Sequence, residues 1–225
     1  MDTKGGTQMG KRVAFVLSGC GNLDGTEIHE AVSALIALDQ AGFRVIYTAP
    51  DIQQSVTTDY VTGEKAAETR NVLREGARIA RGDIRPLSSL EDDDYDLVVL
   101  PGGFGAALNL SSFGTRGENC SVNAEVEQLL RRAHEAGKPI GAMCIAPVIP
   151  ARLFSGVRVT IGNDPGVAAK IDAMGARHVE CAVDDAVTDG SMRVVTTPAY
   201  MLAEGPAEVY AGAVRMVEEL EGLLG

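Results

Sequence analysis

Residues 12–50, RVAFVLSGCGNLDGTEIHEAVSALIALDQAGFRVIYTAP, change twice between a compact apolar pattern and a helical one. Residues 12–18 and 43–48 are short apolar runs, which predicts two buried strands. Between them, residues 26–41 carry apolar side chains at helical spacing, and Gly42 is typical of a helix end. The helical stripe has four members, namely Ile28, Val32, Leu35 and Ile36. The segment therefore predicts a strand–helix–strand unit, from which parallel sheets are built.

The same alternation continues along the rest of the chain. Further strands are predicted at residues 95–100, 138–143, 157–161, 182–187 and 193–196, with Asp189-Gly190 as a hairpin turn between the last two. Helices are predicted at residues 66–81, 123–136, 164–174 and 206–224, and from the segment after Cys144 to about residue 153. Residues 57–63 are predicted as a short strand or turn, and residues 104–121 as a long loop.

Strands of nearly unbroken hydrophobicity that alternate with helices indicate a mostly parallel sheet covered on both faces. We predict one doubly wound α/β domain over residues 11–225. It follows a flexible leader at residues 1–10.

The composition narrows the class of protein. The chain has 225 residues and a formal net charge of -11, so nucleic acids and anionic membranes would repel it. No apolar run approaches the roughly 20 residues that a membrane-spanning helix needs. Its 4 cysteines contain no CxxC pair, and residues 1–10 do not form an export signal, which indicates a reducing compartment and no metal site. We expect a cytoplasmic protein that binds neither nucleic acid nor membrane.

The glycine-rich turn after the first predicted strand has two interpretations. A GxGxxxG pattern at residues 19–25 is similar to a dinucleotide-binding fingerprint, and Asp51 follows the second strand where a ribose-binding acid would stand. The third glycine is one residue late, however. Asp24, Glu27 and Glu30 also put negative charge at the helix start, where a pyrophosphate needs positive potential. We therefore expect no cofactor.

Cys144 stands where a strand passes into a helix. It directly follows the strand at residues 138–143, and small residues surround it, as a tight strand-turn-helix elbow requires. We expect the helix N-terminus behind it to lower the pKa of the thiol by favouring the thiolate. Spacing alone supports a nucleophile and a buried structural cysteine about equally.

The turn at residues 101–103, Pro-Gly-Gly, supplies what a nucleophile would need. A tight turn leaves backbone N–H groups free, so the Gly103 amide can pair with the Ile145 amide as an oxyanion hole. The alternative is an ordinary turn at the exit of a strand.

Four long motifs run through the chain, namely SGCGNLDGTEIHEAV (residues 18–32), PGGFGAALNLS (101–111), GKPIGAMCIAP (137–147) and VVTTPAYML (194–202). They resemble the ElbB family of isoprenoid-biosynthesis proteins with an amidotransferase-like domain, within the PfpI/DJ-type superfamily. The resemblance covers nearly the whole chain, from about residue 11 to residue 224. It implies a flavodoxin-like, class I glutamine amidotransferase-like fold and a homodimer.

The resemblance also implies roles for individual residues. It makes Cys144 the elbow nucleophile and places Glu30 beside it as an acid, with Glu27 one helical turn earlier. Periodicity alone predicts that Glu30 is solvated, because it lies opposite the stripe that contains Ile28 and Val32. The two interpretations agree if the first turn of the helix projects over the sheet edge. A protonated Glu30 could then donate a hydrogen bond to the Cys144 sulfur.

The histidine that superfamily hydrolases carry close after the nucleophile is missing. Ile145 follows Cys144, and residues 160–164 contain no histidine. The chain has 3 histidines, and we interpret each as structural or solvated: His29, His134 and His178. Without a histidine base, amide hydrolysis is disfavoured, and a Cys–Glu pair suits a more electrophilic carbonyl.

These features, with the substrate taken from the resemblance, predict a cofactor-independent glyoxalase. It would convert the small dicarbonyl glyoxal and water to glycolate, or methylglyoxal to lactate. The Cys144 thiolate adds to the aldehyde, Glu30 moves a proton between the two carbons, and the amides of Gly103 and Ile145 hold the oxyanion. The same thiol chemistry would release early glycation adducts from proteins.

The alternative function is a non-catalytic or redox-sensing protein linked to isoprenoid metabolism. Here Cys144 is oxidised, and Cys20 and Cys120, in loops on the predicted active-site side, act as resolving thiols. The other interpretation of these two is a pair of inert loop cysteines. We assign Cys20, Glu27 and Cys120 to the substrate pocket and predict that Cys181 is a core residue.

Overall fold

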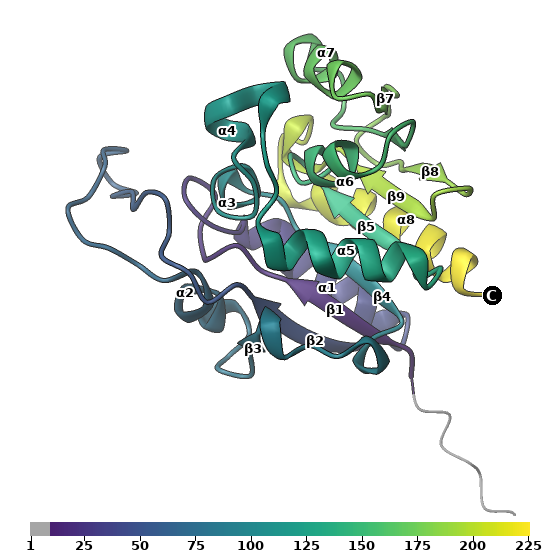
Figure 1. Ribbon diagram of the computed structural model, residues 1–225, viewed down its shortest axis with the longest axis horizontal. Coiled ribbons are helices and arrows are strands. Elements are labelled where there is room, and N and C mark those ends of the chain that lie inside the picture. Colours follow the sequence, from purple (N-terminus) through teal and green to yellow (C-terminus); the bar gives the residue numbers. More distant parts are fainter. Residues whose placement is uncertain (1–9) are drawn as a thin grey trace, which may run out of the picture.

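The computed structural model describes residues 10–225, so the predicted leader lies outside the described residues except for Gly10 (Figure 1). A seven-stranded sheet forms the centre of the molecule. Its strands, in spatial order, are β3 (Arg85–Pro86), β2 (Arg44–Ala49), β1 (Arg12–Val16), β4 (Leu97–Leu100), β5 (Ile140–Met143), β9 (Val194–Thr197) and β8 (Val187–Asp189). Neighbouring strands are parallel except for the antiparallel β8–β9 hairpin. The predicted mostly parallel, doubly wound α/β fold is confirmed.

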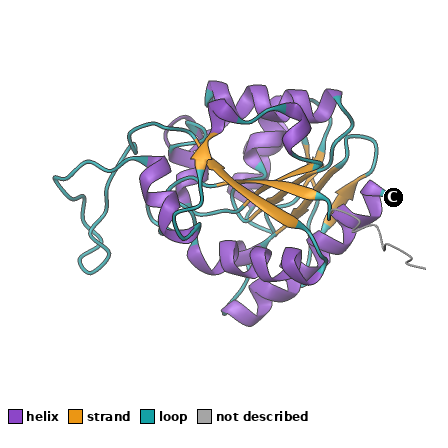
Figure 2. Ribbon diagram, turned by 90° about the horizontal axis from the view of Figure 1, so that it is seen from below, coloured by secondary structure: helices purple, strands orange, loops and turns teal. Residues whose placement is uncertain are grey.

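Helices cover both faces of the sheet (Figures 1 and 2). They are α1 (Ile28–Gln40), α2 (Val72–Ile79), α3 (Phe104–Leu108), α4 (Phe113–Arg116), α5 (Ala124–Glu135), α6 (Val148–Leu153), α7 (Pro165–Ala173) and α8 (Pro206–Leu224). A separate two-stranded parallel sheet pairs β6 (Arg158–Val159) with β7 (Arg177–His178). Within residues 10–225, no helix has both the length and the apolar character needed to cross a membrane.

Two apolar cores lie on opposite faces of the sheet because side chains alternate along each strand. In β4, Val98 and Leu100 join the core that contains Leu129 of α5. Leu97 and Val99 of the same strand join the core beneath α1 and α8. The near-continuous hydrophobicity of the strands thus reflects burial on both faces, as the sequence indicated.

Several predicted boundaries are wrong. The helix predicted at residues 66–81 begins only at Val72, because the Asn71 side chain accepts a hydrogen bond from the Arg74 amide (2.9 Å) and caps the helix there. Of the strand predicted at residues 182–187, only Val187 belongs to β8, and the loop predicted at residues 104–121 contains α3 and α4. The strand predicted at residues 157–161 is the shorter β6, outside the main sheet.

The burial of α1 also differs from the prediction. Ile28, Val32 and Ile36 of the apolar stripe are 43%, 43% and 45% exposed, whereas Glu30 is fully buried. The face that packs inward consists largely of small residues, among them Ala31 and Ala34, and α1 packs against α8. Small side chains let two helices approach closely, and Ile28, Val32 and Ile36 lie outside this contact. The prediction from periodicity that Glu30 is solvated is therefore wrong.

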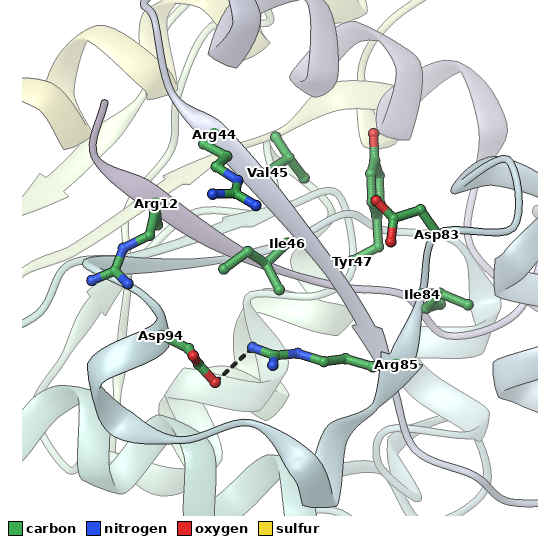
Figure 3. Close-up of a pocket in the computed structure, with 9 residues that line it drawn as sticks. All are labelled: Arg12, Arg44, Val45, Ile46, Tyr47, Asp83, Ile84, Arg85 and Asp94. Carbon is green, nitrogen blue, oxygen red and sulfur yellow. Dashed lines mark hydrogen bonds and ion pairs between the residues drawn. The ribbon is translucent and has the colours of Figure 1, made fainter. Parts of the chain in front are cut away.

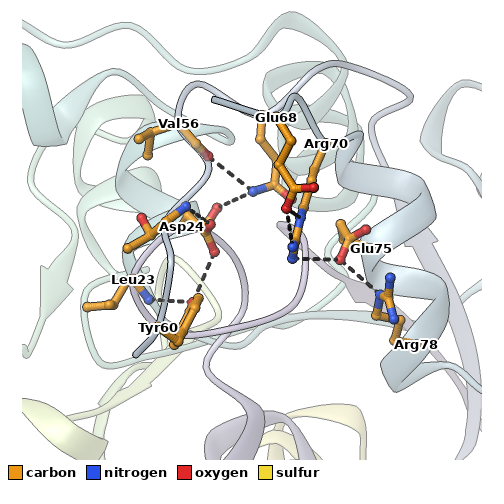
Figure 4. Close-up of polar contacts among 10 residues, drawn as sticks. Leu23, Asp24, Val56, Tyr60, Glu68, Arg70, Glu75 and Arg78 are labelled. Carbon is orange, nitrogen blue, oxygen red and sulfur yellow. Dashed lines mark hydrogen bonds and ion pairs between the residues drawn. The ribbon is translucent and has the colours of Figure 1, made fainter. Parts of the chain in front are cut away.

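A long arm, residues 52–71, extends from the body between β2 and α2 (Figures 1 and 2). It includes the segment predicted as a strand or turn, where a single bridge pairs Thr58 with Lys65. Asp24 fixes the arm to the glycine-rich turn. Its buried carboxylate accepts a hydrogen bond from the Tyr60 hydroxyl (2.9 Å; Figure 4) and another from the Thr58 amide (2.7 Å). Asp24 thus has a structural role, because it holds the arm against the turn.

Candidate active site

Four neighbouring strands of the sheet each lead into one part of the candidate site. Beyond the carboxyl ends of β1, β4, β5 and β9 lie Glu30, Gly102, Cys144 and Tyr200, in that order. Because these strands are parallel and adjacent, their carboxyl ends meet at one edge of the sheet, where open α/β folds bind ligands. Residues far apart in the sequence therefore converge there.

Cys144 adopts a conformation that few residues other than glycine take. Its φ of 59° lies in the left-handed region. The surrounding backbone holds it there, since the Cys144 amide donates to the Thr197 carbonyl (3.0 Å) and the Ala146 amide to the Met143 carbonyl (2.9 Å). Such a sharp, fixed turn after a strand is the geometry of a nucleophile elbow. The sequence predicted a helix N-terminus directly behind the thiol. The helix α6 begins only at Val148, so no helix N-terminus directly adjoins Cys144.

The Glu30 carboxyl lies against the Cys144 thiol. One oxygen, Oε2, accepts a hydrogen bond from the Gly102 amide (2.9 Å), and Oε1 accepts one from the Tyr200 amide (3.2 Å). The Cys144 side chain adjoins this carboxyl, since a Cβ atom added to Gly102 would touch both groups. Glu27, the N-cap of α1, accepts from the Glu30 amide (2.6 Å). The structure thus brings together the Cys144–Glu30 pair that the resemblance implied.

Gly102 allows this contact because it has no side chain. A Cβ atom at this position would lie 2.4 Å from the Cys144 Cβ and 2.5 Å from Glu30 Oε2. Any other residue would therefore separate the carboxyl from the thiol. The next residue, Gly103, has a φ of 95°, and its Cβ would meet the Glu27 amide nitrogen at 2.4 Å.

The amides of Gly103 and Ile145 both act on the Cys144 thiol and favour its ionised form. They come from the turn after β4 and from the elbow itself, as the sequence predicted for an oxyanion hole. Two N–H groups at the sulfur also lie close to where an oxygen on a sulfur-bound carbon would develop charge. Their role in holding an oxyanion remains a prediction.

Burial dominates the ionisation of the pair. It raises the pKa of Glu30 to about 7, and the charge of Glu27 adds to this effect. Burial and the negative charge of Glu30 raise the pKa of the Cys144 thiol well above its usual value, although the Gly103 and Ile145 amides oppose the shift. The expected lowering of the thiol pKa is therefore wrong. Above about pH 7 the pair consists of a thiol and a carboxylate, which can act as its base.

A cavity of about 680 Å³ opens above the thiol. Besides Gly103 and Cys144, its apolar lining residues are Phe104, Ile145, Val167 and Met201. Its polar lining residues are Asn22, Glu27, His29 and Tyr200. Glu27 thus lies where the sequence placed it. Within residues 10–225, no group of three or more His, Cys, Asp or Glu side chains is arranged to hold a metal ion.

Sequence reasoning missed His29 and Tyr200 as cavity residues. His29 Nδ1 and the Tyr200 hydroxyl are 2.7 Å apart and hydrogen-bonded, although 171 positions separate them in the chain. The signal was available for His29, because it lies between Glu27 and Glu30 in the first turn of the helix. The interpretation of His29 as a merely structural or solvated residue overlooked that this turn lines the cavity.

The other cysteines do not line the Cys144 cavity. Cys20 is half-buried, and Glu75 and Arg78 are among the charges that act on its thiol. Cys120 is 1% exposed, with its sulfur 3.8 Å from that of Met174. Neither residue lines the cavity, so their assignment to the substrate pocket is wrong. Cys181 is half-buried, so the prediction that it is a core residue is wrong.

A second cavity, of about 340 Å³, lies along β2 at the side of the sheet (Figure 3). It is lined by Arg12, Arg44, Val45, Ile46, Tyr47, Asp83, Ile84, Arg85 and Asp94. Its arginines are largely neutralised, since Arg85 pairs with Asp94 (2.6 Å) and Arg12 with Asp96 (3.6 Å). It shares no residue with the Cys144 cavity.

A doubly wound sheet that carries a buried cysteine–glutamate pair defines a class of α/β proteins in which a cysteine stands at a strand-exit elbow. The chain belongs to the DJ-1/PfpI family, whose sequence profile matches residues 11–203. This family includes glyoxalases and proteases.

Individual relatives agree with the ElbB resemblance. The human glutamine amidotransferase-like class 1 domain-containing protein 3, mitochondrial, is 46% identical over 224 residues, which cover 95% of this chain and 84% of the relative. The crystal structure of an isoprenoid biosynthesis protein with amidotransferase-like domain from Ehrlichia chaffeensis is 34% identical, with a TM-score of 0.90 over 96% of this chain and 100% of that one. Drosophila melanogaster DJ-1beta, at 21% identity and a TM-score of 0.55 over 96% of each chain, shares the fold.

Proposed function

We propose that the chain is a cofactor-independent glyoxalase that converts glyoxal and water to glycolate, and methylglyoxal to lactate. The observation that carries this proposal is the close approach of the buried Glu30 carboxyl to the Cys144 side chain across Gly102, beside two backbone amides that act on the thiol. Membership of a family that includes glyoxalases supports it. The same thiol chemistry extends to early glycation adducts on proteins.

The first step forms a bond between Cys144 Sγ and the aldehyde carbon. The thiol proton passes to the Glu30 carboxylate, which lies beside the Cys144 side chain. The carbonyl oxygen gains negative charge, which the Gly103 and Ile145 amides stabilise until it takes up the proton. The product of this step is a hemithioacetal.

The second step is an internal redox reaction. Glu30 removes the hydrogen of the sulfur-bound carbon as a proton, and the hydroxyl proton of that carbon moves to the neighbouring oxygen. The resulting enediolate then takes back the proton from Glu30 at the neighbouring carbon. The first carbon is thereby oxidised to a thioester and the second is reduced to an alcohol, so no external oxidant or reductant is needed. Water then adds to the thioester, the carbon–sulfur bond breaks, and the sulfur regains its proton.

Replacement of the nucleophile tests the proposal. Cys144→Ser should lower glyoxal consumption, measured without glutathione, by at least about a hundredfold, because a serine hydroxyl is a much weaker nucleophile at the same position. Circular dichroism should show an unchanged fold. Cys20→Ser is the matched control and should retain wild-type activity, since Cys20 does not line the cavity. Full activity in Cys144→Ser would overturn the mechanism.

The redox-sensing alternative receives less support. A sensor cysteine needs a readily formed thiolate and, for a disulfide, a second thiol nearby. Burial raises the pKa of Cys144, and neither Cys20 nor Cys120 lines its cavity. Mass spectrometry after mild peroxide treatment distinguishes the two functions: ready oxidation of Cys144 together with negligible glyoxal turnover would favour the sensor.

A further inference from the structure

The Cys144 cavity is much larger than glyoxal requires. Its volume of about 680 Å³ lies within the range of roughly 300–1,000 Å³ that is typical of pockets for drug-sized ligands. Glyoxal is the smallest dicarbonyl and would leave most of this volume to water. There is room beside the reacting carbon for a substituent at least as large as an aromatic ring.

Apolar side chains stand beside both predicted oxyanion amides. Phe104 directly follows Gly103, and Ile145 provides the second amide itself. Phe104 is 54% exposed at the cavity, so a bound apolar group could still bury much of its ring. A substituent on the carbon held by these amides would contact Phe104 and Ile145, with Val167 and Met201 completing the apolar wall.

The charge of the cavity restricts this substituent further. Among the described residues that line it, there is no lysine or arginine. One of them, Glu27, is an acid. A carboxylate or phosphate on the substrate would lose hydration without gaining a lysine or arginine partner, and Glu27 would repel it. An uncharged apolar substituent meets neither penalty.

We propose that the site takes α-oxoaldehydes with a bulky, uncharged apolar substituent and that Phe104 and Ile145 select this substituent. This proposal rests on the proposed glyoxalase function. The reaction keeps the same balance as for glyoxal. The aldehyde carbon is oxidised to the level of an acid, the keto carbon is reduced to an alcohol, and one water is consumed. The product is a 2-hydroxy acid that carries the apolar group.

Three dicarbonyls test the inference: glyoxal, phenylglyoxal and 4-carboxyphenylglyoxal, the last matching the aromatic probe but adding a negative charge. Phenylglyoxal should have a kcat/KM about tenfold or more above that of glyoxal, since burial of a ring against apolar walls is worth about 1.4 kcal/mol or more. The carboxylated probe should fall at least about tenfold below phenylglyoxal.

The Phe104→Ala variant assigns the preference to the apolar wall. Its ratio of kcat/KM for phenylglyoxal to that for glyoxal should drop by about fivefold to tenfold. Val61→Ala is the matched control: Val61 is 96% exposed on the arm, so this change should leave both activities at wild-type values.

The outcomes separate this inference from the proposed function. If glyoxal is consumed but phenylglyoxal is no better, or the Phe104→Ala ratio is unchanged, the glyoxalase proposal stands and the substrate class is wrong. If phenylglyoxal and 4-carboxyphenylglyoxal are turned over equally well, the inference that the cavity excludes anionic substituents is wrong. Absence of turnover with all three probes would overturn both proposals.

Discussion

The Glu30 carboxyl is fully buried, and its pKa is raised from 4.5 to about 7. Between these values the folded chain binds more protons than the unfolded chain, so the free energy of unfolding must fall as pH rises through this window. We expect wild type to lose up to about 3 kcal/mol relative to Glu30→Gln between pH 4.5 and pH 8. Urea unfolding of both proteins across this range measures the difference. Parallel pH curves would show that Glu30 does not titrate as described.

The same group should govern the rate. Because the carboxylate is the form that accepts the thiol proton, kcat/KM for glyoxal should rise with pH through about 7. In Glu30→Gln the rise should disappear and the rate should fall by roughly 100-fold or more. Steady-state kinetics from pH 5.5 to 8.5 check both effects. A wild-type profile that is flat across this range would contradict the assignment of Glu30 as the base.

Two side chains at the site illustrate the limit of sequence reasoning. The strand-exit patterns identified Cys144, Gly103 and Ile145, because a strand end is a local signal. The hydrogen bond between His29 and Tyr200 joins positions 171 residues apart, and nothing in either local sequence indicates the contact. Glu30 was found only through the resemblance, since its burial depends on how the helix packs.

At the scale of elements, the turn after β4 determines how closely the carboxyl and the thiol approach. Gly102→Ala should abolish glyoxal turnover and cost about 2 kcal/mol or more of stability, because its Cβ would lie 2.4 Å from the Cys144 Cβ. Gly222→Ala provides the control, since a Cβ there has nothing within 4 Å and lies in the helix α8. Thermal unfolding and glyoxal assays of both variants make the comparison. An active, equally stable Gly102→Ala would contradict the described geometry.

The elements also show why parts of the fold were predictable and others were not. Apolar runs located the main-sheet strands β1, β4, β5 and β9 because burial on both faces leaves a continuous pattern. Periodicity chose the wrong face of α1, since it assumes that the largest apolar side chains face the core. Here alanines such as Ala31 and Ala34 face inward instead, and Ile28 remains 43% exposed.

For the whole molecule, the homodimer implied by the resemblance stays a prediction. The exposed stripe on α1, with Val32 and Ile36 43% and 45% exposed, would supply an apolar interface centre. We expect sedimentation at twice the monomer mass for wild type and at the monomer mass for Val32→Glu. Val61→Glu, at a valine 96% exposed on the arm, should remain dimeric. A monomeric wild type would contradict the prediction.

The order of the strands has a kinetic consequence. The contact between Glu30 and the Tyr200 amide spans 170 positions, and it forms only when β1 and β9 occupy the same sheet with β4 and β5 between them. Loop closure over such a distance is entropically costly and tends to slow folding. During refolding, the proposed glyoxalase activity therefore cannot return before the last of these four strands has docked, and its recovery would time the completion of the sheet.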